Sequence, residues 1–155
     1  MKRPYGKALL SFVAAVTAVT PYLADWNETH IYNPTWSPHA KFHVGHTMLL
    51  GTVLGLLAIW YLWRRTGDPH DNLRVGALFT AAYWLAQAGA ILVPGTAAVD
   101  AQFADRIPTI AGVQPNQVIL DAILLALVAI GYRWQRAELS HRPGTARPAR
   151  TKQSP

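Results

Sequence analysis

The stretch that decides the fold is residues 38–63, PHAKFHVGHTMLLGTVLGLLAIWYLW, in which no charged residue follows Lys41. Its apolar residues show no period-two alternation and include many leucines, so the pattern favours a helix over a strand. A bilayer core of about 30 Å needs roughly 20 apolar residues, and a helix of this length would rise about 39 Å. Ser37 and Pro38 are typical of a helix start. We therefore expect a membrane-crossing helix whose first turns stand in the outer interface.

Three more apolar segments lie around this one, and we expect them to form helices at about residues 8–23, 73–94 and 116–135. The chain is 51% hydrophobic and only 14% charged, whereas soluble domains carry about a quarter charged residues. We predict an all-α fold, an integral membrane four-helix bundle within one domain of residues 1–136. A basic tail, residues 137–155, is rich in Pro and Arg and is predicted to be disordered.

Positive charge predicts the orientation of this bundle. Twelve of the fourteen Lys and Arg residues flank the expected spans on one side, and only Lys41 and Arg106 lie on the other. The positive-inside rule then places both termini in the cytoplasm. We expect a multi-pass protein of the cell (inner) membrane, with the lipid bilayer as its main partner. The basic composition is explained by this topology, so no nucleic-acid partner is predicted.

Residues 25–46, DWNETHIYNPTWSPHAKFHVGH, hold four of the six histidines and are the part of the chain richest in chemically active groups. In the loop that precedes the second helix, the predicted ligand-binding residues are Asp25, Asn27, His30, Asn33 and Trp36. On the helix itself, His39, His43 and His46 fall within a sector of about 60°. This spacing is typical of metal ligands, so we predict a divalent metal such as Zn, Cu or Fe there. A structural role and a metal-free acid–base or ligand-binding role for the same histidines stay open.

The predicted catalytic residues are His43, Gln87 and Asp121. Counted from the expected helix ends, each lies within roughly 7–12 Å of the outer surface. A carboxylate at such depth is costly and usually functional, so we expect the three side chains to converge on one pocket. Hydrogen bonds between neighbouring helices are the alternative role for each of them.

Two features of the sequence leave the packing partners of the helices and the role of the second outer loop undecided. Gly51 and Gly55 form a pair of small residues suited to close helix packing, either within the chain or in a homo-oligomer or with partner helices. The second outer loop, residues 96–117, is mildly apolar and is expected to contain a short helix at residues 97–103. It acts either as a lid or as a connector.

The pattern D-x-N-x-T-H-x-x-N-P-x-W-x-P-H-A-x-F-H, which begins at Asp25 and ends at His43, resembles a family of small, uncharacterised four-span membrane proteins. The resemblance implies a shared site and the same four-span layout. Family members often carry Gln at the position of His46, which weighs against His46 as an obligatory ligand. Some relatives carry an acetyltransferase label, but no residue in this chain supports acyl-CoA chemistry.

Together these features predict an outward-facing pocket rich in His and Asp. The first hypothesis is a membrane enzyme that acts on a lipophilic small molecule, with His43 as general base or metal ligand. The alternative is a non-catalytic membrane subunit that binds a metal or a ligand. A transporter is the weaker third hypothesis, because the chain has no inverted repeat.

Overall fold

The computed structural model describes residues 4–107, 109–110, 112 and 115–141. This part of the chain contains helices and no strand, which confirms the all-α prediction. The helices are, in chain order, α1 (Tyr5–Asp25), α2 (Pro38–Trp63), α3 (Pro69–Ala90), the 3₁₀ helix η1 (Ala101–Arg106) and α4 (Gln117–Ser140).

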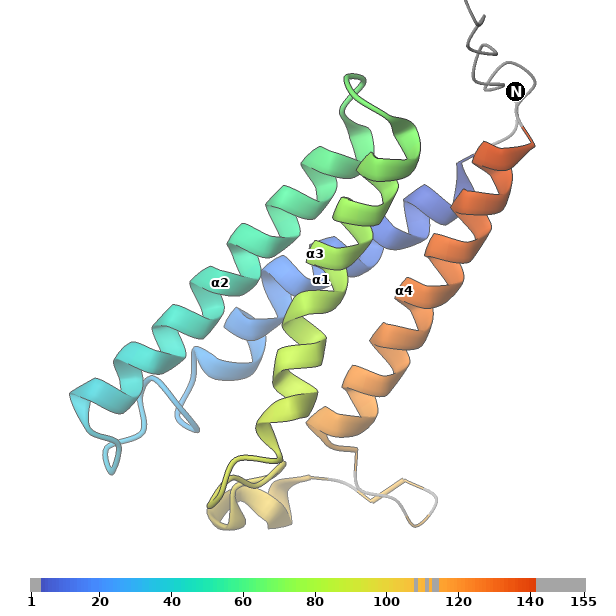
Figure 1. The fold of residues 1–155 in the computed structure, drawn as a ribbon. Helices are drawn as coiled ribbons and strands as arrows, with labels where there is room; N and C mark the ends of the chain where they lie inside the picture. The colour runs from blue at the N-terminus through green and yellow to red at the C-terminus, as the bar shows by residue number, and fades with distance from the viewer. Residues whose placement is uncertain (1–3, 108, 111, 113–114, 142–155) are drawn as a thin grey trace, which may run out of the picture.

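The four long helices lie side by side in one elongated bundle (Figure 1). Helix α1 packs against α2, α3 and α4, and α3 packs between α2 and α4. The start of α1, the α2–α3 turn and the end of α4 lie at one end of the bundle, which we call the terminal end. The two long connections, residues 26–37 and 91–116, lie at the opposite end, which we call the loop end.

The helix boundaries agree with the expected ones for α2 and differ for the others. Ser37 caps α2 by accepting a hydrogen bond from the backbone N–H of Ala40. Helix α3 begins four residues before the expected start because Asp68 caps it. The backbone N–H groups of Asp71 and His70 donate to the Asp68 carboxylate and hold its pKa below the usual value.

The ends of the remaining helices also differ from the expected ones. Helix α1 is longer than expected at both ends and continues through Pro21, and α4 continues to Ser140. The short helix of the second loop is η1, which starts later than the expected residues 97–103. Most of the predicted disordered tail, residues 142–155, lies outside the described residues.

Three helices, α1, α2 and α4, are long and apolar enough to cross a membrane. Helix α3, which we expected as a fourth span, is not among them. Its first turns carry His70, Asp71, Asn72 and Arg74, and it ends at Ala90, so the apolar residues 91–93 fall outside the helix. Because α3 packs between other helices, its weaker hydropathy is compatible with its place in the bundle.

Glycines set how closely α1 approaches its neighbours. A Cβ atom on Gly55 would lie 2.5 Å from the carbonyl oxygen of Ala14, and one on Gly51 would lie 2.7 Å from that of Thr17. At the terminal end, a Cβ on Gly6 would lie 2.6 Å from the carbonyl oxygen of Gly131 on α4. The small-residue face of α2 is therefore covered by α1 of the same chain.

Hydrogen bonds between side chain and side chain or backbone join the helices across this core. The indole N–H of Trp84, on α3, donates to the Thr17 hydroxyl of α1 at 2.8 Å, and both side chains are fully buried. The backbone N–H of Lys7 donates to the Gln135 side chain of α4 at 2.9 Å. In an apolar surrounding such bonds are costly to lose, so they fix which helix faces meet.

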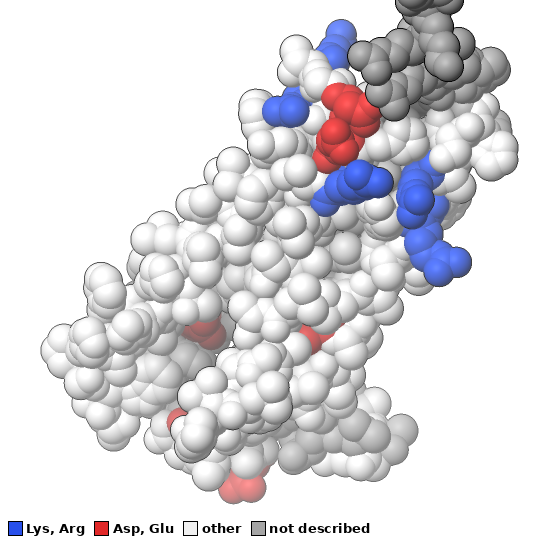
Figure 2. Space-filling model, viewed as in Figure 1, with Lys and Arg blue, Asp and Glu red and all other residues white. Residues whose placement is uncertain are grey.

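Most charged side chains lie near the two ends of the bundle. On the face shown in Figure 2, Lys and Arg side chains gather at the terminal end, and the flanks of the helices are mostly uncharged. Large apolar side chains are exposed along these flanks, among them Leu56 on α2 and Ile123 on α4. Exposed apolar flanks with charged ends are typical of a helix bundle in a bilayer.

The glycine contacts predict a sharp difference between two substitutions on α2. Gly55→Ala should lower the free energy of unfolding by about 1–3 kcal/mol, because the added methyl group overpacks the α1 contact. Gly45→Ala should leave it unchanged or raise it, since nothing lies within 4 Å of its Cβ position and alanine favours helix. Thermal unfolding in detergent measures both. Equal effects of the two substitutions would contradict this packing.

Candidate functional site

The connection between α1 and α2, residues 26–37, is called the first loop. It is organised by a motif that occurs twice, Asn-x-Thr at residues 27–29 and 33–35. In each copy the asparagine side-chain oxygen accepts hydrogen bonds from the backbone N–H and the hydroxyl of the threonine two residues later, at 2.6–2.9 Å. Asn33 is only 2% exposed, and its amide group donates to the carbonyl oxygen of Thr29. These bonds hold the loop in one shape and occupy the predicted ligand-binding residues Asn27 and Asn33.

The same motif holds the ring of His30. The Thr29 hydroxyl lies 2.6 Å from Oδ1 of Asn27 and 2.7 Å from Nδ1 of His30. In the tautomer in which Nδ1 donates to that hydroxyl, Nε2 is the accepting nitrogen of the neutral ring. A carboxylate oxygen of Asp25 lies 3.6 Å from the same Nδ1. Thr29 and Asp25 therefore both contact one nitrogen of His30.

A wide groove of about 1090 Å³ lies at the loop end. Its walls come from the first loop, from residues 95–101 and η1 of the second loop, and from the start of α4. His30 and Trp36 contribute from the first loop, with their rings edge to face at 5.0 Å. The second loop therefore forms one wall of a binding-sized groove.

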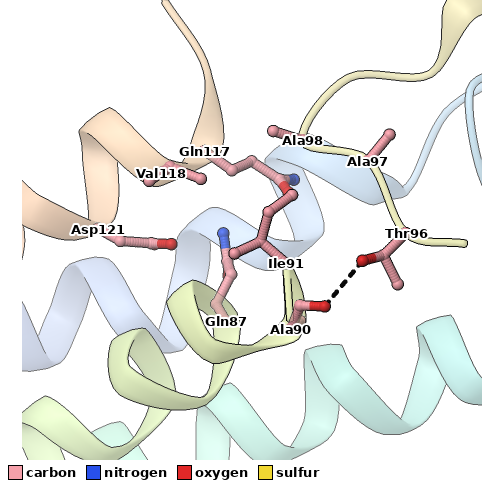
Figure 3. A pocket seen from close by; sticks show the side chains of 9 residues that line it. All are labelled: Gln87, Ala90, Ile91, Thr96, Ala97, Ala98, Gln117, Val118 and Asp121. Carbon is pink, nitrogen blue, oxygen red and sulfur yellow. Dashed lines mark hydrogen bonds between the residues drawn. The ribbon is translucent and has the colours of Figure 1, made fainter. Parts of the chain in front are cut away.

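A smaller cavity of about 70 Å³ adjoins this groove between α3, α4 and the second loop (Figure 3). Gln87 enters it from α3 and Asp121 from α4. Thr96, Ala97, Ala98 and Gln117 line both the cavity and the groove. The cavity has room for about two water molecules or one small polar group.

Asp121 differs from the other buried polar residues. Its side chain is 1% exposed, and neither carboxylate oxygen has a hydrogen-bond partner among the described residues. Each of the others has at least one such bond: Thr17, Asn33, Asn72, Thr80 and Gln135. Burying an unpaired polar group is costly, so the carboxylate is suited to a partner that enters the cavity.

The three predicted metal ligands lie elsewhere, on the exposed face of α2. The Nε2 atoms of His39 and His43 are 3.1 Å apart, and His46 is exposed as well. Within the described residues, no group of three or more His, Asp, Glu or Cys side chains could hold a metal ion. None of the three histidines is among the described walls of the groove or cavity. Metal binding and the catalytic role of His43 stay predictions.

The structure therefore brings together part of the predicted site. Gln87 and Asp121 share the small cavity, and His30 and Trp36 line the adjoining groove. The sequence reasoning missed Gln117, although it precedes Asp121 by four residues and so lies on the same helix face. It also missed Thr96 and Ala98, because no signal in the sequence shows whether a loop residue lines a pocket or only connects two helices.

The chain belongs to a family of unknown function, DUF6640, whose model matches residues 9–147. No curated protein and no solved structure matches the chain. The family assignment thus agrees with the resemblance to an uncharacterised family and adds no activity to the geometry described above.

The unpaired carboxylate predicts a gain of stability on its removal. Asp121→Leu should raise the free energy of unfolding by about 1–3 kcal/mol, because it removes a buried polar group that has no partner. For a chain of this length each kcal/mol corresponds to roughly 2–4 °C in Tm. Thermal unfolding of the ligand-free protein in detergent measures the change. Thr17→Val serves as the control and should lower Tm, since it breaks the bond to Trp84. A fall in Tm for Asp121→Leu would show that the carboxylate has a structural partner.

Proposed function

We propose that this chain is a four-span membrane protein that binds a lipophilic small molecule in the loop-end groove. In this proposal Asp121 and His30 exchange protons with the bound molecule, and the protein is an enzyme. The observation that carries the proposal is the buried Asp121 carboxylate, unpaired among the described residues, in a small cavity that adjoins a large groove.

The membrane part of the proposal is supported by the three apolar helices and the exposed apolar flanks. Helix α3 would be the fourth span, because it runs beside the other helices between the same two ends of the bundle (Figure 1). The Lys and Arg side chains at the terminal end support a cytoplasmic location for that end. The groove would then open on the outer side of the cell membrane.

The composition of the groove supports a lipophilic occupant. Most of its lining surface is apolar and includes Val99, Phe103, Ile107 and Leu120, and its polar lining residues include His30, Asp100, Arg106 and Gln117. A concave apolar surface with a few convergent polar groups is typical of a small-molecule site.

The proton-exchange part is supported by the state of the two titratable groups. In this proposal His30 accepts a proton at Nε2, while its Nδ1 is held by Thr29 and Asp25. Asp121 has both oxygens available within the described part of the chain. General acid–base catalysis requires such groups within hydrogen-bond reach of the bound molecule. A non-catalytic ligand-binding subunit is the alternative, and it would need only the groove.

The groove predicts the behaviour of a blocking variant. Wild-type protein purified in a neutral detergent should release a lipophilic molecule on organic extraction, detected by mass spectrometry. Ala98→Trp should reduce its amount at least tenfold, because Ala98 lines both the groove and the cavity. Leu56→Trp is the matched control on an exposed apolar face of α2 and should retain the molecule. If Ala98→Trp folds and carries the same amount as the control, the groove is not the binding site.

A further inference from the structure

We infer that the occupant of the groove is a lipophilic amine, whose apolar body lies in the groove and whose ammonium head enters the small cavity to pair with Asp121. This inference rests on the proposed function and names the chemical class of its ligand.

The cavity lacks a cation of its own. Its described walls contain one charged side chain, Asp121, and the neutral polar side chains of Gln87, Thr96 and Gln117. A carboxylate is an acceptor only, and an isolated buried charge is strongly unfavourable unless it is paired. A carboxyl group in such a site is either protonated or paired with a cation, and a bound ammonium group would supply the cation that the described walls lack.

The head group follows from the size and the acceptors of the cavity. A volume of about 70 Å³ holds one small group rather than a ring system. An ammonium group carries three donors and a positive charge, so it can satisfy both oxygens of Asp121 and one side-chain amide oxygen. A hydroxyl has one donor and no charge, and a carboxylate head would be repelled by Asp121.

The body of the ligand follows from the groove, which continues from the cavity through Ala98 and Gln117. Apolar side chains of η1 and of the start of α4 line it, among them Phe103 and Leu120. The described walls of the groove also carry one cation, Arg106, and one anion, Asp100, neither of which is among the cavity walls, and the Arg106 guanidinium stacks over the Phe103 ring at 4.9 Å. An amphiphile with its cationic end inward fits this distribution of charge.

The test compares three probes with the same chain and different heads: dodecylammonium, dodecanol and dodecanoate. Each is added to the full-length protein in phosphatidylcholine nanodiscs, and binding is measured as the rise in Tm with probe concentration. Dodecylammonium should bind the wild type at least tenfold more tightly than either other probe. Asp121→Asn should remove this preference while still binding dodecanol, which shows that the variant is folded.

Two variants complete the design. Asp105→Asn removes an exposed carboxylate at the same end of the bundle, outside both the cavity and the groove, and it should keep the full preference for the amine. Ala98→Trp should abolish the binding of all three probes. An equal affinity for amine and alcohol, or an unchanged preference in Asp121→Asn, would overturn the amine assignment but not the groove as the binding site. No response to any probe in the wild type, or unchanged responses in Ala98→Trp, would overturn the groove as well.

Discussion

The close approach of α1 to α2 and α4 is the constraint on which the rest of the structure depends. At Gly51, Gly55 and Gly6 a single added carbon would meet a backbone carbonyl of the neighbouring helix. In a bilayer, apolar side chains gain little by leaving lipid for protein, so small residues and hydrogen bonds decide which faces meet. With α1 fixed in this way, Thr17 meets Trp84 and holds α3 in the bundle. The loop ends of α3 and α4 are then close enough to enclose a cavity.

Within this frame nearly every buried polar side chain has a partner, and Asp121 is the exception among the described residues. A bundle selected for stability alone would place an apolar residue there, because an unpaired buried carboxylate lowers the free energy of unfolding. Retaining such a group at the inner end of a groove is common at functional sites, where stability is given up for binding or chemistry. His30, whose Nδ1 lies next to Thr29 and Asp25, lines the groove that adjoins this cavity.

The sequence was sufficient for the helices and for part of the site. Ser37 and Pro38 marked the start of α2, and helical depth placed Gln87 and Asp121 at one level, where the structure has them in one cavity. Histidine spacing put His39 and His43 on one face, and their rings are indeed adjacent. Histidine spacing could not show that this face is exposed, because the faces of α2 differ little in hydropathy. The glycine contacts mark the buried side: Gly51 faces α1, and His43 lies about 80° around the helix from Gly51. The wall formed by residues 95–101 depends on contacts between distant loops that no local pattern encodes.

The central claim is that Asp121 is buried in a small cavity that adjoins the groove. The chain has no cysteine, so Asp121→Cys introduces a single thiol with no background. We predict that small methyl methanethiosulfonate modifies this thiol in the folded protein and that bulky fluorescein maleimide does not. A thiol introduced by Gln102→Cys on the exposed η1 should react with both reagents. Adding Ala98→Trp to Asp121→Cys should slow the small reagent at least tenfold. A thiol at position 121 that is inert to both reagents, or that reacts equally well with both, would contradict the account.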